Sequence, residues 1–123
     1  MHYVCSTDMR HLDLTYIKEN VTEDNDFIKE LLNVFLSSLD DDCKEFFDSV
    51  DAKDHSVIRR SAHKLKSSFR SLGMDEMASI MQSIENCAFN QAPLEQINEL
   101  KSRLEGLLPE VKDEVREMLS RLD

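Results

Sequence analysis

Residues 54–73, DHSVIRRSAHKLKSSFRSLG, contain the pattern on which the fold prediction depends. Apolar residues recur there every three or four positions, which is typical of an α-helix with one buried face. Asp54 suits the N-cap of this helix, and Gly73 suits the C′ position just beyond its end. The stretch therefore predicts one helix with defined ends, and its core positions are Ile58, Ala62, Leu65, Phe69 and Leu72.

The same helical period continues on both sides of this stretch. It predicts a long helix over residues 24–52 and, before that, a short leading helix over residues 12–20. After the stretch, Asp75 and Glu76 open a further helix, which ends at a loop over residues 90–92. Acidic residues at these starts favour helix formation because they face the positive end of the helix dipole.

A final helix follows Pro93, which suits the first turn of a helix. Gly106 and Pro109 fall inside its apolar pattern without interrupting the period, so we expect a kink and not a break. Four amphipathic helices with short connections form an antiparallel bundle. The predicted fold class is therefore all-α, an antiparallel four-helix bundle with a short additional N-terminal helix. We expect one domain over residues 1–123, with residues 1–11 as a loose N-terminal segment.

Composition excludes several functional classes. The chain has 123 residues, only two Gly and two Pro, and a net charge of −10, which argues against a binder of nucleic acid or of anionic membranes. No apolar run approaches the roughly 20 residues that cross a bilayer. There is no signal-peptide pattern, and three cysteines without a CxxC pair are typical of reduced thiols, so we expect a cytoplasmic protein. A bundle that covers its own apolar faces is expected to be a monomer.

One helix differs from the rest in charge. Residues 54–73 hold five Lys or Arg residues and one acidic residue, although the whole chain is acidic. A helical wheel places four side chains on one stripe away from the core. A basic stripe that contains a histidine suggests a site for a small anion or an acidic partner, although on spacing alone a solvated surface is the commoner explanation. The stripe consists of Arg59, His63, Lys66 and Arg70.

Histidine in this setting has a specific chemistry. Neutral imidazole is a nucleophile near pH 7, and its attack on a phosphoryl group gives an N-phosphorylated histidine. Cations one helical turn away would stabilise the charge of the transferring group. A carrier of this kind should keep its histidine exposed, so that a second protein can reach the phosphorus.

Residues 62–73, AHKLKSSFRSLG, closely resemble the signature A-H-x-L-K-G-S-x-x-x-L-G of histidine-containing phosphotransfer (HPt) domains. His63 matches the phosphorylated histidine of that family, and Lys66 matches the lysine three residues later. DNDFIKELLNVFLSSL at residues 24–39 and MDEMASIMQSIENCA at residues 74–88 are similar to the helices that flank the motif. The resemblance covers roughly residues 12–120. The packing and helix-end positions of the motif are matched by Leu65, Leu72 and Gly73.

Two positions depart from the family pattern, and a third is variable in it. Ser67 stands where the family usually has Gly, although a branch of small free-standing bacterial phosphotransfer proteins in quorum-sensing relays also has K-S-S here. Phe69 replaces a usually small residue, and the wheel directs it into the bundle. Glu85 corresponds to a glutamate that hydrogen-bonds the histidine ring in chemotaxis kinases, where many other members have Gln. The resemblance implies that Glu85 orients His63 and favours one tautomer, but a surface glutamate near a basic strip is about as common.

The resemblance implies a phosphorelay carrier in two-component signalling. It would accept a phosphoryl group on His63 from an aspartate of one receiver domain and pass it to an aspartate of another. The sequence has no ATP-binding motif, so we expect the protein to have no ATP-dependent kinase activity. We expect a phosphoryl carrier and not an enzyme. No cofactor is expected, because in this family Mg²⁺ is held by the acidic pocket of the receiver. The residues expected to face the partner are Arg59, Ser67, Arg70 and Gly73.

Two other classes of function differ from the carrier in features that the sequence or a simple assay can distinguish. A non-phosphorylated helical adaptor, or a degenerate family member that binds receivers without carrying phosphate, is separated from the carrier by phosphate uptake at His63. A di-iron bundle protein would need inward-facing Glu-x-x-His pairs, which the sequence lacks. No metal site is expected, since the spacing of His2, His11 and His55 suggests none.

Overall fold

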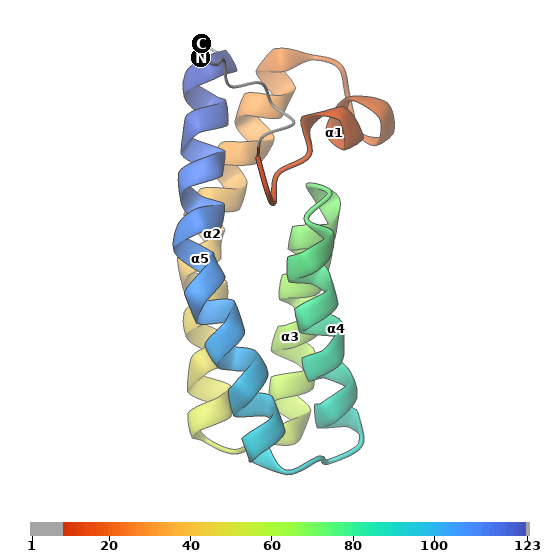
Figure 1. Cartoon of the computed structure of the whole chain (residues 1–123), viewed down its shortest axis with the longest axis vertical. Helices are drawn as coiled ribbons and strands as arrows, with labels where there is room; N and C mark the ends of the chain where they lie inside the picture. The colour runs from red at the N-terminus through yellow and green to blue at the C-terminus, as the bar shows by residue number, and fades with distance from the viewer. Residues whose placement is uncertain (1–8, 123) are drawn as a thin grey trace.

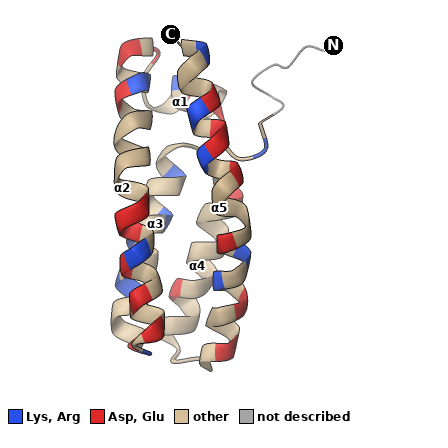
Figure 2. Cartoon of the chain, turned by 90° about the vertical axis from the view of Figure 1, so that its left-hand side faces the viewer, with Lys and Arg blue, Asp and Glu red and all other residues tan. Residues whose placement is uncertain are grey.

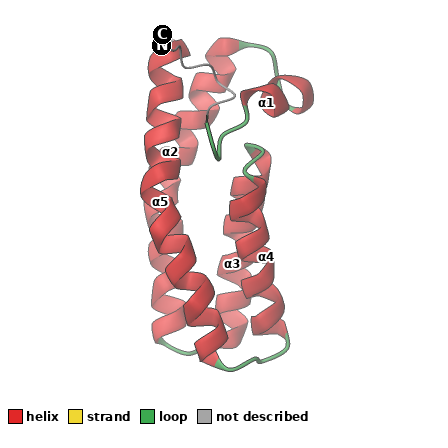
Figure 3. Cartoon of the chain, viewed as in Figure 1, coloured by secondary structure: helices red, strands yellow, loops and turns green. Residues whose placement is uncertain are grey.

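The computed structural model describes residues 9–122, and within them it contains helices and loops but no strand (Figure 3). The predicted all-α class is confirmed. The five helices are α1 (Leu14–Asn20), α2 (Asn25–Asp51), α3 (His55–Ser71), α4 (Asp75–Phe89) and α5 (Leu94–Leu122).

Helices α2 to α5 form the antiparallel bundle. Each packs against two neighbours, with α3 between α2 and α4, and α5 between α4 and α2. Helices α2 and α5 have 27 and 29 residues, whereas α3 and α4 have 17 and 15, so the long pair extends beyond the short pair at one end (Figure 1). The short helix α1 lies at that end, near the turn that joins α3 to α4 (Figure 1).

Aspartate N-caps set the starts of three helices. The side chain of Asp13 accepts a hydrogen bond from the backbone N–H of Tyr16, and Asp24 and Asp54 make equivalent bonds at the starts of α2 and α3. Each bond satisfies a backbone donor that has no partner within the helix. These caps explain why α1 and α2 begin slightly later than the apolar pattern predicts, whereas the predicted cap at Asp54 is confirmed.

The end of α3 depends on a glycine. Gly73 has a φ of 72°, in the left-handed region, and so fulfils the predicted C′ role. A Cβ atom at this position would lie 3.0 Å from side-chain atoms of Tyr16. Glycine is therefore required here for space as well as for backbone conformation, because α1 packs directly against the α3–α4 turn.

The last helix passes through both of its atypical residues. α5 continues across Gly106 and Pro109, as predicted. Pro109 lies on the exposed side of the helix, where water can bond a carbonyl that has lost its helical partner.

The core is aromatic and aliphatic and extends along the whole bundle. Phe69 is fully buried, as the wheel predicts, and its ring meets that of Phe35 edge to face at 6.0 Å between centroids. Cys43 is also buried, and burial raises the pKa of its thiol to about 12, so that this cysteine is inert at neutral pH. Four of the six methionines fill the core, as predicted: Met74, Met77, Met81 and Met118.

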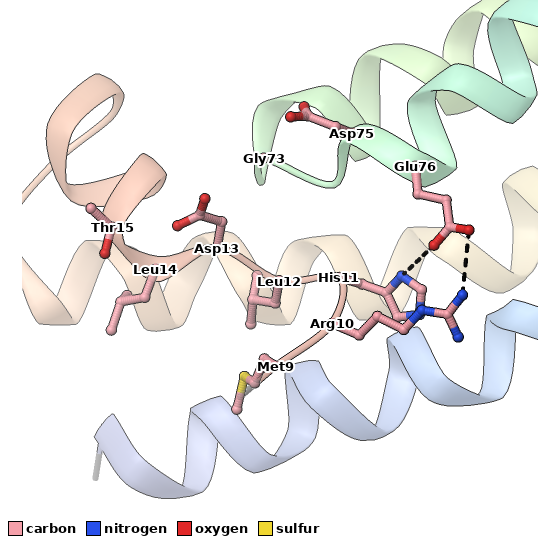
Figure 4. A pocket seen from close by; sticks show the side chains of 10 residues that line it. All are labelled: Met9, Arg10, His11, Leu12, Asp13, Leu14, Thr15, Gly73, Asp75 and Glu76. Carbon is pink, nitrogen blue, oxygen red and sulfur yellow. Dashed lines mark hydrogen bonds and ion pairs between the residues drawn. The ribbon is translucent and has the colours of Figure 1, made fainter. Parts of the chain in front are cut away.

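Residues 9–12 form a short segment, the strap, that crosses from α5 to α4 near the start of α4 (Figure 4). The backbone N–H groups of His11 and Leu12 donate to the same oxygen of Glu114, at 2.8 and 2.9 Å. Arg10 pairs with Glu76 at 3.4 Å, and the buried ring of His11 lies 3.8 Å from that carboxylate. The strap is therefore fixed to both helices by carboxylates. Residues 1–8 lie outside the described part of the chain.

Candidate functional site

His63 lies on the outer face of α3, and its side chain is 60% exposed. Its Nδ1 atom is 3.1 Å from Oε2 of Glu85 on α4. An ionised carboxylate only accepts hydrogen bonds, so Nδ1 carries a proton and donates a hydrogen bond to Glu85. In the neutral ring this tautomer leaves the lone pair on Nε2, which makes no hydrogen bond within residues 9–122. The arrangement orients the imidazole and leaves its second nitrogen available as a nucleophile whenever the ring is neutral.

Glu85 links His63 to Lys66. Its second oxygen forms an ion pair with Nζ of Lys66 at 2.8 Å, and the carboxylate is largely shielded from solvent. Desolvation acts to raise the pKa of Glu85, but the contacts with Lys66 and His63 outweigh it and hold that pKa below its ordinary value. The carboxylate is thus ionised at neutral pH, as its role of acceptor from the imidazole requires.

Lys66 is not an exposed member of the stripe, and the prediction that it points away from the core is wrong. The residue is only 8% exposed, and its Nζ also donates to Oε1 of Gln82 at 3.0 Å. The wheel places Lys66 at the border of the buried face, and α4 packs against that border. The aliphatic stem is consequently covered, while the ammonium group reaches the polar seam between α3 and α4.

The other predicted site residues divide into two groups. Arg59 and Arg70 are exposed on α3, as the stripe predicts, and Ser67 is exposed beside them. Gly73 lies about 15 Å along the helix axis from His63, at 1.5 Å per residue, and it contacts α1 instead of the site. The structure therefore brings Arg59 and Ser67 close to His63 and leaves Gly73 with a role in the fold.

Three side-chain pairs form successive rungs across the α3–α4 seam. Residue numbers rise along α3 while they fall along α4, as they must between antiparallel helices. Sequence reasoning missed Gln82 and Phe89. Both follow from pairing the residues of α3 with those of α4 about the turn at Gly73, since one helix then runs back along the other. The rungs are Lys66 with Gln82, His63 with Glu85, and Arg59 with Phe89.

The surroundings of His63 are basic on an otherwise acidic protein. Acidic residues recur along α2 and α5 (Figure 2), whereas α3 contains none. Lys64 pairs with Asp42 of α2 at 3.1 Å, and that contact raises the pKa of Lys64. A small pocket beside the histidine is lined by Ser56, Arg59, Arg60, His63 and Glu85. Its arginines would favour an anion or an acidic partner surface.

Replacement of Glu85 by Gln should change how stability depends on pH. Because the pKa of Glu85 is lower in the folded than in the unfolded protein, its ionised form stabilises the fold. That contribution is complete above the ordinary glutamate pKa of about 4.3 and is lost as the pH falls further. The difference in free energy of unfolding between parent and Glu85→Gln should thus shrink between pH 6 and pH 3, as measured by urea unfolding. Glu95→Gln, at an exposed position on α5, controls for the loss of one carboxylate. A difference in free energy of unfolding between parent and Glu85→Gln that does not vary with pH would contradict the expectation.

Neither a metal centre nor a membrane span is found in the described residues. Across residues 9–122, no group of three or more His, Cys, Asp or Glu side chains could hold a metal ion. No helix in the same range is both long enough and apolar enough to cross a bilayer.

Comparison with known proteins gives one family and one similar structure. A comparison with curated proteins gives no match. The structure is similar to the HPT domain of an Hpt sensor hybrid histidine kinase from Shewanella, with a TM-score of 0.78 and 21% sequence identity over 89% of this chain and 94% of that one. This likeness shows the same helical-bundle fold. The family model described as Hpt domain matches residues 30–123. The chain therefore belongs to the Hpt domain family, whose members are phosphocarriers that work with receiver domains in two-component systems.

Proposed function

We propose that this protein is a phosphorelay carrier whose phosphorylated residue is His63. The single observation that carries the proposal is the exposed side chain of His63, whose Nδ1 is held by Glu85 so that Nε2 can act as the nucleophile. The Nε2 lone pair attacks the phosphorus of an aspartyl phosphate on one receiver domain. An N–P bond forms, the O–P bond breaks, and the receiver aspartate leaves as a carboxylate. Transfer to a second receiver reverses these steps and regenerates the neutral ring.

Charges around the imidazole support this chemistry. Glu85 stabilises the positive ring that forms when Nε2 binds phosphorus, because its carboxylate faces the Nδ1–H. Lys66 forms an ion pair with the same carboxylate, and this contact places its ammonium group within one helical turn of His63. Arg59 and Arg70 add positive charge along the exposed face of α3. We propose that the Mg²⁺ needed for transfer belongs to the acidic pocket of the receiver domain.

A transfer assay tests the function directly. Each receiver domain encoded in the same genome is phosphorylated with a radiolabelled phosphoryl group and mixed with this protein. We expect label to leave at least one receiver and to appear on this protein, and then to move to a second, unlabelled receiver. If no receiver passes label to the parent protein, the carrier function is overturned in favour of a receiver-binding adaptor. ATP alone should give no label.

Ser67 offers a test of where the receiver docks. Its exposed side chain lies one turn after His63, where the family usually has Gly. The receiver aspartate and its metal must line up with the N–P bond, which leaves little room beside the ring. Ser67→Gly should transfer at least as fast as the parent, whereas Ser67→Tyr should keep the fold and lose most transfer. Ser67→Glu should also be slow, because it places negative charge beside phosphate and an acidic pocket.

The series is read as the rate of label transfer from one receiver, with circular dichroism as the check on folding. Ser37→Tyr places the same ring on the exposed face of α2 and should transfer at the parent rate. A Ser67→Tyr variant that matches the parent would show that the receiver approaches His63 from another side of α3.

A further inference from the structure

Phe89 is an exposed aromatic residue at the edge of the candidate site. It is the last residue of α4 and is 64% exposed, more than any other large hydrophobic residue in the described part of the chain. The guanidinium group of Arg59 lies 4.6 Å from the centroid of its ring. One side of the ring is thus held by a cation from α3, although its exposure means that the ring adds little to the core.

The Arg59–Phe89 pair is the rung next to His63 and Glu85. Arg59 precedes His63 by four residues on α3, and Phe89 follows Glu85 by four residues on α4, so both lie about one turn, roughly 6 Å, along the same seam. Arg59 also lines the pocket that His63 and Glu85 share. A protein that reaches Nε2 of His63 must therefore come close to the ring of Phe89.

Aromatic and arginine side chains have properties that suit an anchor for protein binding. They dominate the energetics of protein interfaces, where a few such residues carry most of the affinity. A phenylalanine ring has only two rotatable side-chain bonds, and the contact with Arg59 restricts it further, so little conformational entropy remains to be lost on binding. The same contact keeps the guanidinium group beside the ring, where it can meet a carboxylate of the partner.

We propose that the Arg59–Phe89 pair is a docking anchor for the receiver domain that exchanges phosphate with His63. This inference rests on the proposed carrier function. The surface fits a partner that covers the ring with an apolar side chain and places a carboxylate against Arg59 or its exposed neighbour Arg60. A receiver domain brings its own acidic pocket to His63, so its rim meets this basic and aromatic surface with complementary charge.

Charge favours a receiver over a second copy of this chain as the occupant. In a two-fold symmetric dimer the same patch faces itself, so that Arg59 and Arg60 would meet the same two cations of the other copy. Each copy also carries a net charge of −10, which adds repulsion between the remaining surfaces. An acidic rim on a different protein avoids both costs.

The test measures binding separately from phosphate transfer. Isothermal titration is carried out with unphosphorylated receiver domains from the same genome and with His63→Gln, which cannot carry phosphate. We expect Phe89→Ala in this background to weaken binding of the cognate receiver about tenfold or more, a loss typical of an interface anchor. Arg59→Ala should weaken it in the same direction. Val34→Ala, which removes an exposed apolar side chain from α2, is the matched control and should bind like the parent.

Kinetics give a second readout. With His63 present, Phe89→Ala should raise the receiver concentration for half-maximal transfer about tenfold and leave the maximal rate unchanged, because Phe89 touches no reacting atom. Equal affinity of Phe89→Ala and parent for the receiver overturns the anchor, even when label reaches His63. A dimer of the parent that Phe89→Ala dissociates in sedimentation also overturns it, in favour of a second copy. Weakened binding in a protein that never takes up label supports the anchor and overturns only the carrier.

Discussion

His63→Gln should take up no phosphate from any receiver, while its helix content and its free energy of unfolding stay close to those of the parent. The ring is more than half exposed, so its loss opens no cavity in the core. Glutamine retains an amide that can donate to Glu85, but it has no nitrogen lone pair of comparable nucleophilicity. The expected effect is therefore complete loss of labelling, with circular dichroism and urea unfolding as the checks on the fold.

The chemical stability of the label gives independent evidence for its site. A phosphohistidine is a phosphoramidate, so the label on the parent protein should be lost in mild acid and retained in alkali. His55→Gln is the matched control, since it removes the other histidine of α3, whose ring bonds the carbonyl of Ala92. That variant should accept label like the parent. Label that remains on His63→Gln, or that survives mild acid, would show that another residue is modified.

Lys66→Ala should slow transfer about tenfold to a hundredfold without unfolding the bundle. The ammonium group contacts Glu85 at 2.8 Å, within one turn of the attacking nitrogen. Loss of one charge-assisted contact costs about 1.5–3 kcal/mol, which corresponds to that range of rates. Because Lys66 is buried, the variant also leaves the Glu85 carboxylate without its cation, and we expect some loss of stability as well.

A second substitution separates charge from packing. Lys66→Met keeps an unbranched apolar stem in the seam but removes the ammonium group, so it should transfer as slowly as Lys66→Ala and unfold at a higher urea concentration. Lys44→Ala removes an exposed lysine whose only described partner is Asp48 on the same helix, and it should leave the rate unchanged. A Lys66→Met protein that transfers within twofold of the parent would show that Lys66 has only a packing role.

Sequence patterns predict the fold well because its determinants are local. The cap at Asp54, the turn at Gly73 and the inward direction of Phe69 each follow from a few neighbouring residues, and the structure confirms all three. The helical wheel misplaces Lys66, because a wheel describes one helix and says nothing of how closely a second helix covers the border of its apolar face. The contact of Glu85 with His63 depends on the register of α3 against α4, so the pattern within one helix left a surface glutamate open, and only the family resemblance implied the contact that the structure contains.

The strap lies beyond local sequence reasoning for a different reason. His11 has no helical pattern around it, and its buried ring lies within 4 Å of carboxylates that are far away in the chain, 3.8 Å from Glu76 and 3.7 Å from Glu110. The strap also lies outside residues 30–123, the range that the family model matches. The attachment of these residues is thus a feature of this chain that neither periodicity nor the family motif predicts.

The turn at Gly73 has a consequence for how the molecule acquires its reactive centre during folding. The proposed nucleophile His63, the carboxylate of Glu85 that contacts it and the lysine beside them all belong to one helical hairpin, in which a short turn joins α3 to α4. The entropy lost on closing a loop grows with loop length, so these contacts cost less to form than the pairing of α2 with α5. Openings that detach the strap or separate the far ends of α2 and α5 can leave the hairpin intact. The proposed chemistry therefore rests on contacts within one helical hairpin, and the long helices pack around a centre that is local in the chain.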